Sequence, residues 1–348
     1  MLEAMAHARF SPRIGVALSG GGAAGMAHVG VLAELTAAGI RIDCVAGTSA
    51  GAMVGAAFAA EHLAAFHDTM CALTRRRVLW LFNPVWPHSG LFEAHRALDL
   101  IRPYVGERIE TLPHAYAAVA ADLRSGAEVV LRHGSVLEAI RASAAIPGLF
   151  TPQPSAGRLL VDGGLVNPLP VDVARQLGAP FVIAVSVLAL PPNALLSPDE
   201  PGGLAAQLAA RLHRHTKRPT AAPARPDIPA QRREAATVRD LSLVDVLTRA
   251  SAMVQARIAL SRLRRCPPDF LINVAVPEIG LFDFHRSAEA VAAGRAAARA
   301  AFPDLRLALA GPPLRRRVVR WLNGTTARPA PPRRPAQQSV SSAALHGH

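Results

Sequence analysis

Apolar runs that each lead into a helical pattern restrict the fold of this 348-residue chain more than any other feature. The runs RIGVAL at 13–18 and FVIAVSVL at 181–188 show almost no alternation with polar residues. A strand of this kind is buried on both faces, as in parallel sheets that helices cover from either side. The chain is therefore expected to be an α/β protein with a mainly parallel central sheet.

Strands and helices are expected to alternate along most of the chain. The expected strands are 13–18, 40–46, 116–120, 128–132, 158–161, 181–188 and 270–276. The expected helices are 23–37, 50–62, 93–105, 135–145, 171–177, 241–264 and 287–301. The apolar run 44–60 is at the low edge of the length that spans a membrane. Its glycines indicate a buried strand, turn and helix instead.

Two segments rich in proline and arginine divide the chain. Composition of this kind is typical of loops and disordered tails. We therefore expect a main domain at 13–190, an insertion at 191–240, the remainder of the same domain at 241–302, and a basic, disordered tail at 303–348. Because 51% of the residues are apolar, the chain has enough material for a sizeable core.

The net charge of +13 is concentrated in the same two regions. Residues 207–240 carry 8 basic and 3 acidic side chains, and residues 303–348 carry 8 and 1. A codon bias that favours arginine explains this charge, and attraction to an anionic membrane surface is the alternative. No nucleic-acid recognition motif accompanies the charge, so a nucleic-acid partner is not expected.

The three cysteines, Cys44, Cys71 and Cys266, lie far apart in the sequence. Their number and spacing fit neither a disulfide framework nor a zinc site, which favours a reducing compartment and predicts no bound metal. The first residues, MLEAMAHARFSPR, lack the apolar core of a signal peptide. A cytoplasmic location is expected, with possible attachment to the inner membrane face.

A serine between two glycines follows the second expected strand. Gly47-Thr48-Ser49-Ala50-Gly51 matches G-x-S-x-G, in which a sharp strand-to-helix turn presents a serine hydroxyl. A serine is a weak nucleophile unless a base lies within hydrogen-bond reach. The motif therefore predicts Ser49 as a nucleophile and requires a partner for it.

A glycine-rich loop follows the first expected strand, where Gly20, Gly22 and Gly25 match G-x-G-x-x-G. A dinucleotide site would need an acid at the end of the second strand. Asp43 has a suitable distance in sequence but lies at the start of that strand. No Gly-Lys-Ser/Thr follows, which excludes a P-loop. The remaining use of the loop is an oxyanion hole made of the Gly20, Gly21, Gly22 and Ala50 amides.

Among the 13 histidines none is well placed to serve as the base. The order Ser49, Asp162, His285 matches that of an α/β-hydrolase triad, but too few strands precede Ser49 for that architecture. His28 is expected to be a buried histidine with a satisfied hydrogen bond. The better candidate is Asp162, which ends a short apolar strand and is followed by Gly163 and Gly164. A dry pocket would raise the pKa of this carboxyl group and make it a better base.

The motifs GGGAAG, GTSAG and DGG, in this order, resemble those of the patatin-like phospholipases, particularly the bacterial members. The resemblance covers 13–188, including IRASAAIPGLFTP, and resumes at VPEIGLFDFHRS. It implies a three-layer α/β/α fold, a Ser49–Asp162 dyad and an oxyanion hole at Gly20–Gly22. Ala24 departs from the pattern, because the family usually carries Arg or Lys there, where a cation could hold the loop or an anionic head group.

The expected function is therefore that of a serine lipid acyl hydrolase acting on phospholipids, lysophospholipids or related lipids. No metal or organic cofactor is implied. A general carboxylesterase for small esters and a lipid-binding protein without turnover remain as alternatives. The stretches 75–86 and 315–322 combine arginines with tryptophans, a composition typical of segments that bind membrane interfaces.

Overall fold

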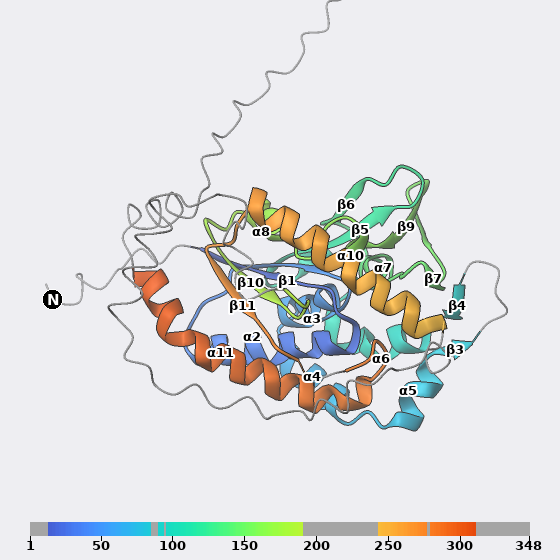
Figure 1. Ribbon diagram of the computed structural model, residues 1–348, viewed down its shortest axis with the longest axis horizontal. Helices are drawn as coiled ribbons and strands as arrows, with labels where there is room; N and C mark the ends of the chain where they lie inside the picture. Colours follow the sequence, from blue (N-terminus) through green and yellow to red (C-terminus); the bar gives the residue numbers. More distant parts are fainter. Residues whose placement is uncertain (1–12, 85–89, 94, 191–242, 277–278, 311–348) are drawn as a thin grey trace, which may run out of the picture.

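The computed structural model describes residues 13–84, 90–93, 95–190, 243–276 and 279–310. A sheet of 8 strands runs through its middle in the order β11-β10-β1-β2-β5-β9-β8, with β6 also paired to β5. Helices lie on both sides of this sheet (Figure 1). The predicted three-layer α/β/α architecture is confirmed.

The parallel part of the sheet contains the most apolar strands. Its members are β1 (Ile14–Leu18), β2 (Cys44–Thr48), β5 (Ala115–Asp122), β10 (Phe181–Ser186) and β11 (Phe270–Asn273). The edge beyond β5 is antiparallel, and its members are β6 (Glu128–Leu131), β8 (Gln153–Ser155) and β9 (Arg158–Asp162). The expected strand 158–161 is thus present but runs against its neighbour β5.

The two larger of three hydrophobic cores lie on the two faces of the sheet. One core buries the inward faces of most helices, and these are α2 (Ala27–Ala37), α3 (Ala50–Ala59), α4 (Leu63–Cys71), α6 (His95–Val105), α7 (Val136–Ser143) and α11 (Ser287–Ala310). The other core is covered by α8 (Val171–Gln176) and α10 (Leu243–Arg265). Side chains alternate between the cores along each strand, so that Val16 points to the first and Ala17 to the second.

Several short elements lie outside the pattern that the sequence predicts. The helices α4 and α5 (Arg75–Leu81) fill a stretch in which no regular structure is expected. A second sheet of 3 strands joins β3 (Asn83–Pro84), β4 (Gly90–Glu93) and β7 (Gly148–Phe150). Short 3-10 turns complete the chain, namely η1 (Gly22–Met26), η2 (Ile109–Thr111), η3 (Gly163–Leu165) and η6 (Phe284–Arg286).

The apolar run 44–60 forms the strand β2 and the helix α3, as predicted. No helix in the described ranges is both long and apolar enough to cross a membrane. The expected insertion at 191–240 lies outside the described residues. Of the expected tail, the described part continues α11 through Pro303 to Ala310.

Candidate active site

Ser49 occupies the turn between β2 and α3 in a backbone conformation that L-residues rarely adopt. Its φ is 54° and its ψ is −120°. A non-glycine residue held there costs about 1–3 kcal/mol, so the surroundings must fix it. The Ser49 amide donates a hydrogen bond to Ser143 Oγ at 2.8 Å, and Ser143 Oγ donates to the Val119 carbonyl at 2.5 Å. The fully buried Ser143 thereby connects the turn to β5.

The serine turn and the glycine-rich loop touch each other through Gly51. A Cβ at Gly51 would lie 2.4 Å from the Leu18 carbonyl and 2.6 Å from the Ser19 carbonyl. Only glycine permits this approach, which explains the second glycine of the G-x-S-x-G motif. The two loops therefore adjoin one site, as the sequence predicts.

One of the four backbone amides that the sequence predicts for the oxyanion hole already has a hydrogen-bond partner in the fold. The Gly20 amide donates to the Pro168 carbonyl at 3.1 Å, so it is occupied, and the prediction that it binds an oxyanion needs correction. Gly22 opens η1 and Ala50 opens α3, and the amide of a first helical residue has no partner within its helix. Both Gly22 and Ala50 line the cavity described below. Gly21 precedes Gly22 at the cap of η1.

His28 supports the glycine-rich loop from α2. Its Nε2 lies 2.8 Å from the Ser19 carbonyl, and the ring is fully buried. Burial lowers the pKa of His28 to about 4, so the ring is neutral near pH 7 and Nε2 acts as the donor. His28 is thus a buried structural histidine, as predicted.

Asp162 reaches Ser49 because two strands share one edge of β5 from opposite directions. The parallel strand β2 ends with Thr48 opposite Val119, and the antiparallel strand β9 ends with Asp162 opposite Ala120. The other edge of β5 is paired with β6. The carboxyl ends of β2 and β9 therefore converge, which brings residues 49 and 162 together across about a hundred residues of sequence.

Gly163 permits the chain to turn at this junction. A Cβ at Gly163 would lie 2.2 Å from the Val119 carbonyl, the same group that accepts the Ser143 hydrogen bond. The Gly164 amide then donates to Asp162 Oδ1 at 2.6 Å. The Asp-Gly-Gly sequence thus turns the chain tightly and fixes one oxygen of the carboxyl group.

The Asp162 carboxyl group is almost completely buried, at 2% exposure. Burial raises the pKa of Asp162 to about 6, and hydrogen bonding from the Gly164 amide and the Ser49 hydroxyl opposes part of that rise. Oδ2 has no partner with complete hydrogen-bond geometry among the described residues. Hydrogen bonds between catalytic groups are commonly long in a free enzyme and tighten only when a substrate is bound. The site therefore combines a serine in a strained turn with a carboxyl group whose pKa is near neutrality.

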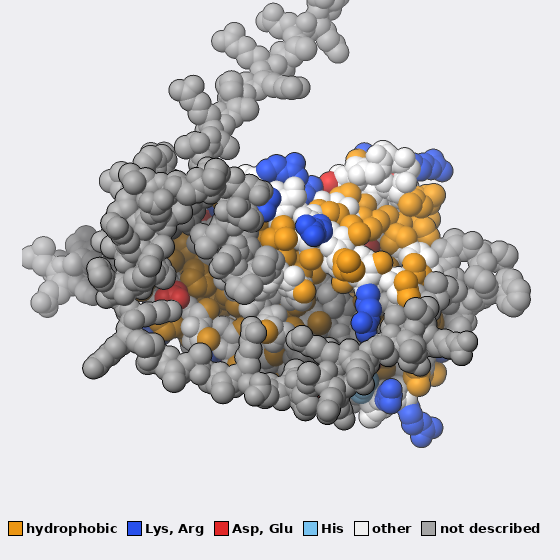
Figure 2. Space-filling model, in the orientation of Figure 1, with side chains coloured by type: hydrophobic (Ala, Val, Ile, Leu, Met, Phe, Trp, Pro, Cys, Tyr) orange, Lys and Arg blue, Asp and Glu red, His pale blue; other side chains and the backbone are white. Residues whose placement is uncertain are grey.

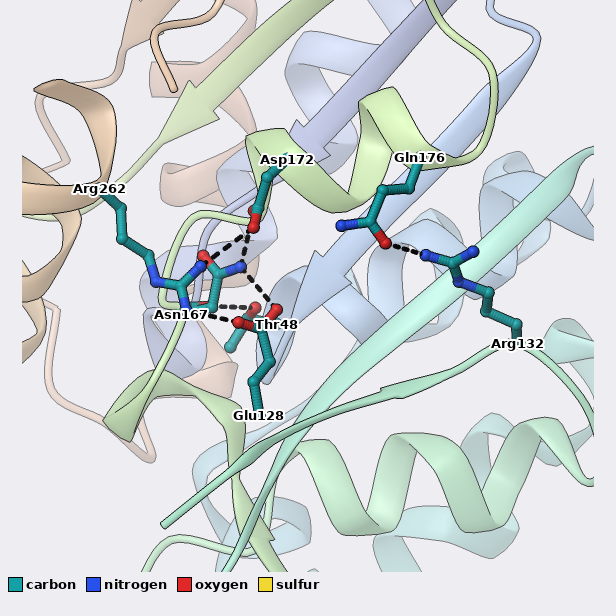
Figure 3. A network of polar contacts seen from close by, with 7 residues as sticks. All are labelled: Thr48, Glu128, Arg132, Asn167, Asp172, Gln176 and Arg262. Carbon is teal, nitrogen blue, oxygen red and sulfur yellow. Dashed lines mark hydrogen bonds and ion pairs between the residues drawn. The ribbon is translucent and has the colours of Figure 1, made fainter. Parts of the chain in front are cut away.

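A polar network supports the chain on the far side of this junction (Figure 3). Asn167 Nδ2 donates to Glu128 at 3.0 Å and to Asp172 at 2.8 Å, and Arg262 of α10 pairs with the same two carboxylates. The Asn167 carbonyl accepts from Thr48 Oγ1 at 2.7 Å. The network therefore ties the loop after Asp162 to the residue before Ser49.

A cavity of about 220 Å³ opens beside Ser49. Most of its lining is apolar, and five phenylalanines contribute to it, namely Phe82, Phe92, Phe150, Phe282 and Phe284. Phe82 packs against Phe282 with ring centroids 4.8 Å apart. The segment 281–284 is far from the serine turn in sequence. Only the chain fold shows that it forms part of the cavity wall.

Several residues that the sequence singles out lie elsewhere. His285 is absent from the described cavity lining, and its Nδ1 lies 3.9 Å from Asp283 Oδ1. Asp43 accepts a hydrogen bond from the Ile14 amide at 2.8 Å, at the end of β1 opposite the glycine-rich loop, so it cannot serve a nucleotide bound there. Ala24 lies in η1 outside the lining. No group of potential metal ligands occurs in the described ranges.

Neither Ser143 nor Arg141 is marked as a site residue by the sequence motifs. Ser143 contacts the Ser49 turn, and Arg141 lines the cavity. Both belong to the stretch IRASAAIPGLFTP, which the sequence offers only as part of a resemblance. No spacing rule marks either residue, because their neighbours come from distant parts of the chain.

Known proteins similar to this chain agree with the motifs. A family model described as patatin-like phospholipase matches residues 16–175. An uncharacterised NTE family protein of Mycobacterium tuberculosis is 35% identical over 330 residues, which cover 83% of this chain and 91% of the relative. Mouse patatin-like phospholipase domain-containing protein 6 is 36% identical over 183 residues, which cover 50% of this chain and 13% of that protein.

Among solved structures, VipD of Legionella pneumophila matches with a TM-score of 0.42 and 13% identity, covering 83% of this chain and 66% of VipD. The family model and the sequence relatives together show the family, since the mycobacterial protein is matched over 91% of its length. The chain belongs to the patatin-like phospholipase family of lipid ester hydrolases.

Proposed function

We propose that this protein hydrolyses the acyl ester of single-chain lipids, including lysophospholipids, with Ser49 as nucleophile and Asp162 as general base. The observation that carries the proposal is the convergence of β2 and β9 on one edge of β5. This convergence supports the pairing of Ser49, in a strained turn, with a buried carboxyl group whose pKa is about 6. A base whose pKa lies near the working pH is both ionised and basic enough to accept the serine proton.

In the first half of the reaction Ser49 Oγ attacks the ester carbonyl carbon while its proton passes to Asp162. The carbonyl oxygen becomes an oxyanion, which the amides of Gly21, Gly22 and Ala50 stabilise together with the amino ends of η1 and α3. When the intermediate collapses, Asp162 returns the proton to the departing alcohol. The acyl group then remains on Ser49.

In the second half a water molecule attacks the acyl-enzyme and gives its proton to Asp162. The same amides bind the second oxyanion. Collapse breaks the bond to Ser49 Oγ, which takes the proton back from Asp162, and the fatty acid leaves. Each proton that Asp162 accepts is thus returned, and neither half of the reaction requires a cofactor.

The cavity beside Ser49 is proposed as the acyl site. Its apolar lining suits a hydrocarbon chain, and its volume of about 220 Å³ lies below that of sites for drug-sized ligands, about 300–1,000 Å³. A site of this size favours one acyl chain over two. Hydrolysis should therefore depend on acyl length, with the best chains being those that fill the cavity.

A membrane-facing surface is proposed at α5, where part of the stretch 75–86 lies. Leu79 and Trp80 are 72% and 47% exposed, and the guanidinium groups of Arg77 and Arg96 lie over the Trp80 ring at 4.3 and 4.5 Å. Exposed apolar and aromatic groups beside arginines are typical of interfacial segments. Phe82, which follows α5, lines the cavity, so this surface adjoins the substrate site.

The helix α10 carries a further set of exposed apolar side chains. Its exposed apolar side chains are Val246, Leu247, Met253 and Val254. Figure 2 shows apolar and basic side chains along this helix. Gln255 of α10 packs against Gly164, so α10 passes directly over the loop that follows Asp162. The stretch 315–322 and Trp86 lie outside the described residues.

The decisive experiment combines a fluorophosphonate probe with a set of esters of increasing acyl length. We expect the probe to label the wild-type protein at Ser49, and the products to be fatty acids released from single-chain lipids. Ser49→Ala is the blank for both measurements. Fast hydrolysis of short, water-soluble esters with no gain from longer chains would favour a general carboxylesterase. Absence of labelling and of turnover would favour a lipid-binding protein.

A further inference from the structure

We propose that Arg141 binds the phosphate of the substrate's leaving group and so selects phospholipid-type esters over neutral ones. The inference rests on the proposed function and adds a specificity-determining residue to it. Its basis is a cationic side chain in the wall of an apolar cavity, close to the serine turn and without a counter-ion among the residues that the structure describes.

The lining of the cavity contains few groups that could bind a charged substrate. Apart from Ser49, the side chains with polar ends in its described lining are His95, Arg141 and Thr151, and no aspartate or glutamate is among these described residues. Asp162 is buried behind Ser49 and does not belong to the lining. An anionic group that enters the cavity therefore meets a cation and, within the described lining, no opposing carboxylate.

Arg141 differs from the other half-buried arginines of the described chain. Arg175, Arg262, Arg286 and Arg295 pair with carboxylates, Arg132 donates to Gln176, and Arg96 donates to the Trp80 carbonyl and lies over the Trp80 ring. Arg141 is also half-buried, but it has no hydrogen-bond or ion-pair partner among the described residues. A guanidinium group that is partly removed from water and lacks a counter-ion is stabilised when it binds an anion.

The position of Arg141 relative to the nucleophile is fixed by its helix. Ser143, two residues further along α7, accepts the hydrogen bond from the Ser49 amide at 2.8 Å. Ile140, the preceding residue, is buried at 2% exposure and lines the same cavity. Arg141 is therefore carried by a rigid element that also holds the serine turn, which is the arrangement required for selecting one end of a substrate.

The chemistry of guanidinium favours a phosphate as the ligand. Its planar fork donates two parallel hydrogen bonds to a phosphate or a carboxylate. In a lysophospholipid the phosphate is joined to the alcohol that leaves during acylation, whereas the acyl chain lies on the other side of the ester. Ala24 of the glycine-rich loop carries no charge and lies outside the described cavity lining. Arg141 is the arginine that the described lining supplies.

The test compares two esters with the same acyl chain, 1-decanoylglycerol and 1-decanoylglycerol 3-phosphate (a lysophosphatidic acid), which differ only in the phosphate group. Arg141→Gln should lower kcat/KM for the lysophospholipid by about ten- to a hundredfold, as expected for loss of a charged hydrogen bond. Its kcat/KM for decanoylglycerol should change by less than about threefold. Arg141→Lys keeps the charge but loses the fork, so its loss should be intermediate and again limited to the phosphate ester.

Arg102→Gln is the matched control, because Arg102 lies on α6, a helix that lines the cavity, but points its guanidinium at Asp99 outside it. This control variant should leave the kcat/KM for both esters unchanged. An equal loss on both esters for Arg141→Gln and Arg141→Lys would overturn the proposal and make Arg141 a structural residue. An equal loss in Arg102→Gln and Arg141→Gln would mean that net charge alone matters, which also overturns it.

A binding measurement separates this proposal from the proposed function. Decyl phosphate and decanoate are titrated into the protein carrying Ser49→Ala, with and without Arg141→Gln. Weaker binding of decyl phosphate after Arg141→Gln, with decanoate little changed, supports a phosphate site even if no ester proves to be hydrolysed. Weakening of decanoate alone would assign Arg141 to the fatty acid product and overturn the proposal.

Discussion

The Ser49 amide donates its hydrogen bond to the side chain of Ser143, 94 positions further along the chain, at 2.8 Å. Ser143 in turn donates to the Val119 carbonyl, which lies where the pairing of β2 with β5 ends. The strained turn of Ser49 is therefore held by a side chain and not by a strand partner. This relationship makes Ser143 a positioning residue for the proposed nucleophile.

Ser143→Ala should lower kcat by about ten- to a hundredfold with little change in KM, because the Ser49 turn loses the partner of its amide while the cavity keeps its lining. The measurement is steady-state hydrolysis together with the rate of fluorophosphonate labelling. Ser135→Ala is the control, since Ser135 caps the same helix and its loss costs about 1 kcal/mol of stability. A similar fall of kcat in both variants would show that Ser143 acts only through the stability of α7.

Ser49→Ala and Asp162→Asn should each abolish most turnover, by roughly 10³–10⁶-fold, and the double variant should be little worse than either. The losses do not add because one residue attacks only while the other accepts its proton. Steady-state kinetics on one soluble ester measures all three variants. His285→Ala is the control and should stay within about tenfold of wild type. Substantial activity in Asp162→Asn would exclude the dyad.

The kcat/KM of the wild type should rise with pH and level off above about pH 6, because Asp162 must be ionised to accept the serine proton and burial raises its pKa to about 6. A pH profile on an ester with a non-ionising leaving group measures this midpoint. The pH profile of Ser143→Ala should have the same midpoint at a lower plateau. A midpoint near pH 4, the usual range of an exposed aspartate, would contradict the proposed environment of Asp162.

Asp162→Asn should make the protein more stable at pH 8 and not at pH 4. Folding raises the pKa of Asp162. The contribution of the protonated carboxyl group to the stability of the folded protein is therefore fully present below the pKa that Asp162 has in the unfolded chain, and it is lost as the pH rises through about 6. Removing the ionisable group should therefore add about 2–3 kcal/mol at pH 8. Denaturant unfolding at the two pH values measures the difference. A gain of the same size at both would point to a cause other than ionisation.

Replacing Leu79 and Trp80 together by alanine should lower activity on anionic vesicles several-fold while leaving a small soluble ester almost unaffected. Both side chains are exposed beside arginines, and a lipid hydrolase meets its substrate in aggregates. Binding to the vesicles should also weaken with salt, because the charges are screened. Leu123→Ala is the control, since Leu123 is 51% exposed on the turn after β5. Equal losses on vesicles and soluble ester would place Leu79 and Trp80 in the substrate site.

The sequence by itself determined the parallel centre of the sheet and the nature of the proposed catalytic pair. Uninterrupted apolar strands are stable only between two layers of helices, so their pattern specifies the α/β class. The glycines beside Ser49 and Asp162 mark turns that other residues cannot form, and such local constraints are readable along the chain. For the same reason the short helices α4 and α5, which packing stabilises more than pattern, were not predicted.

Only the tertiary structure decided how those residues meet. The direction of β9 is set by its pairing with β5 and β8, which no local pattern encodes, and the antiparallel direction is what brings Asp162 to the end of β2. The occupied Gly20 amide, the contact of Ser143 with Ser49 and the cavity wall at 281–284 likewise depend on segments far apart in sequence. Hydrogen-bond partners and burial arise from long-range packing. The fold alone therefore determines which backbone amides lack a partner and which carboxyl group is buried away from water.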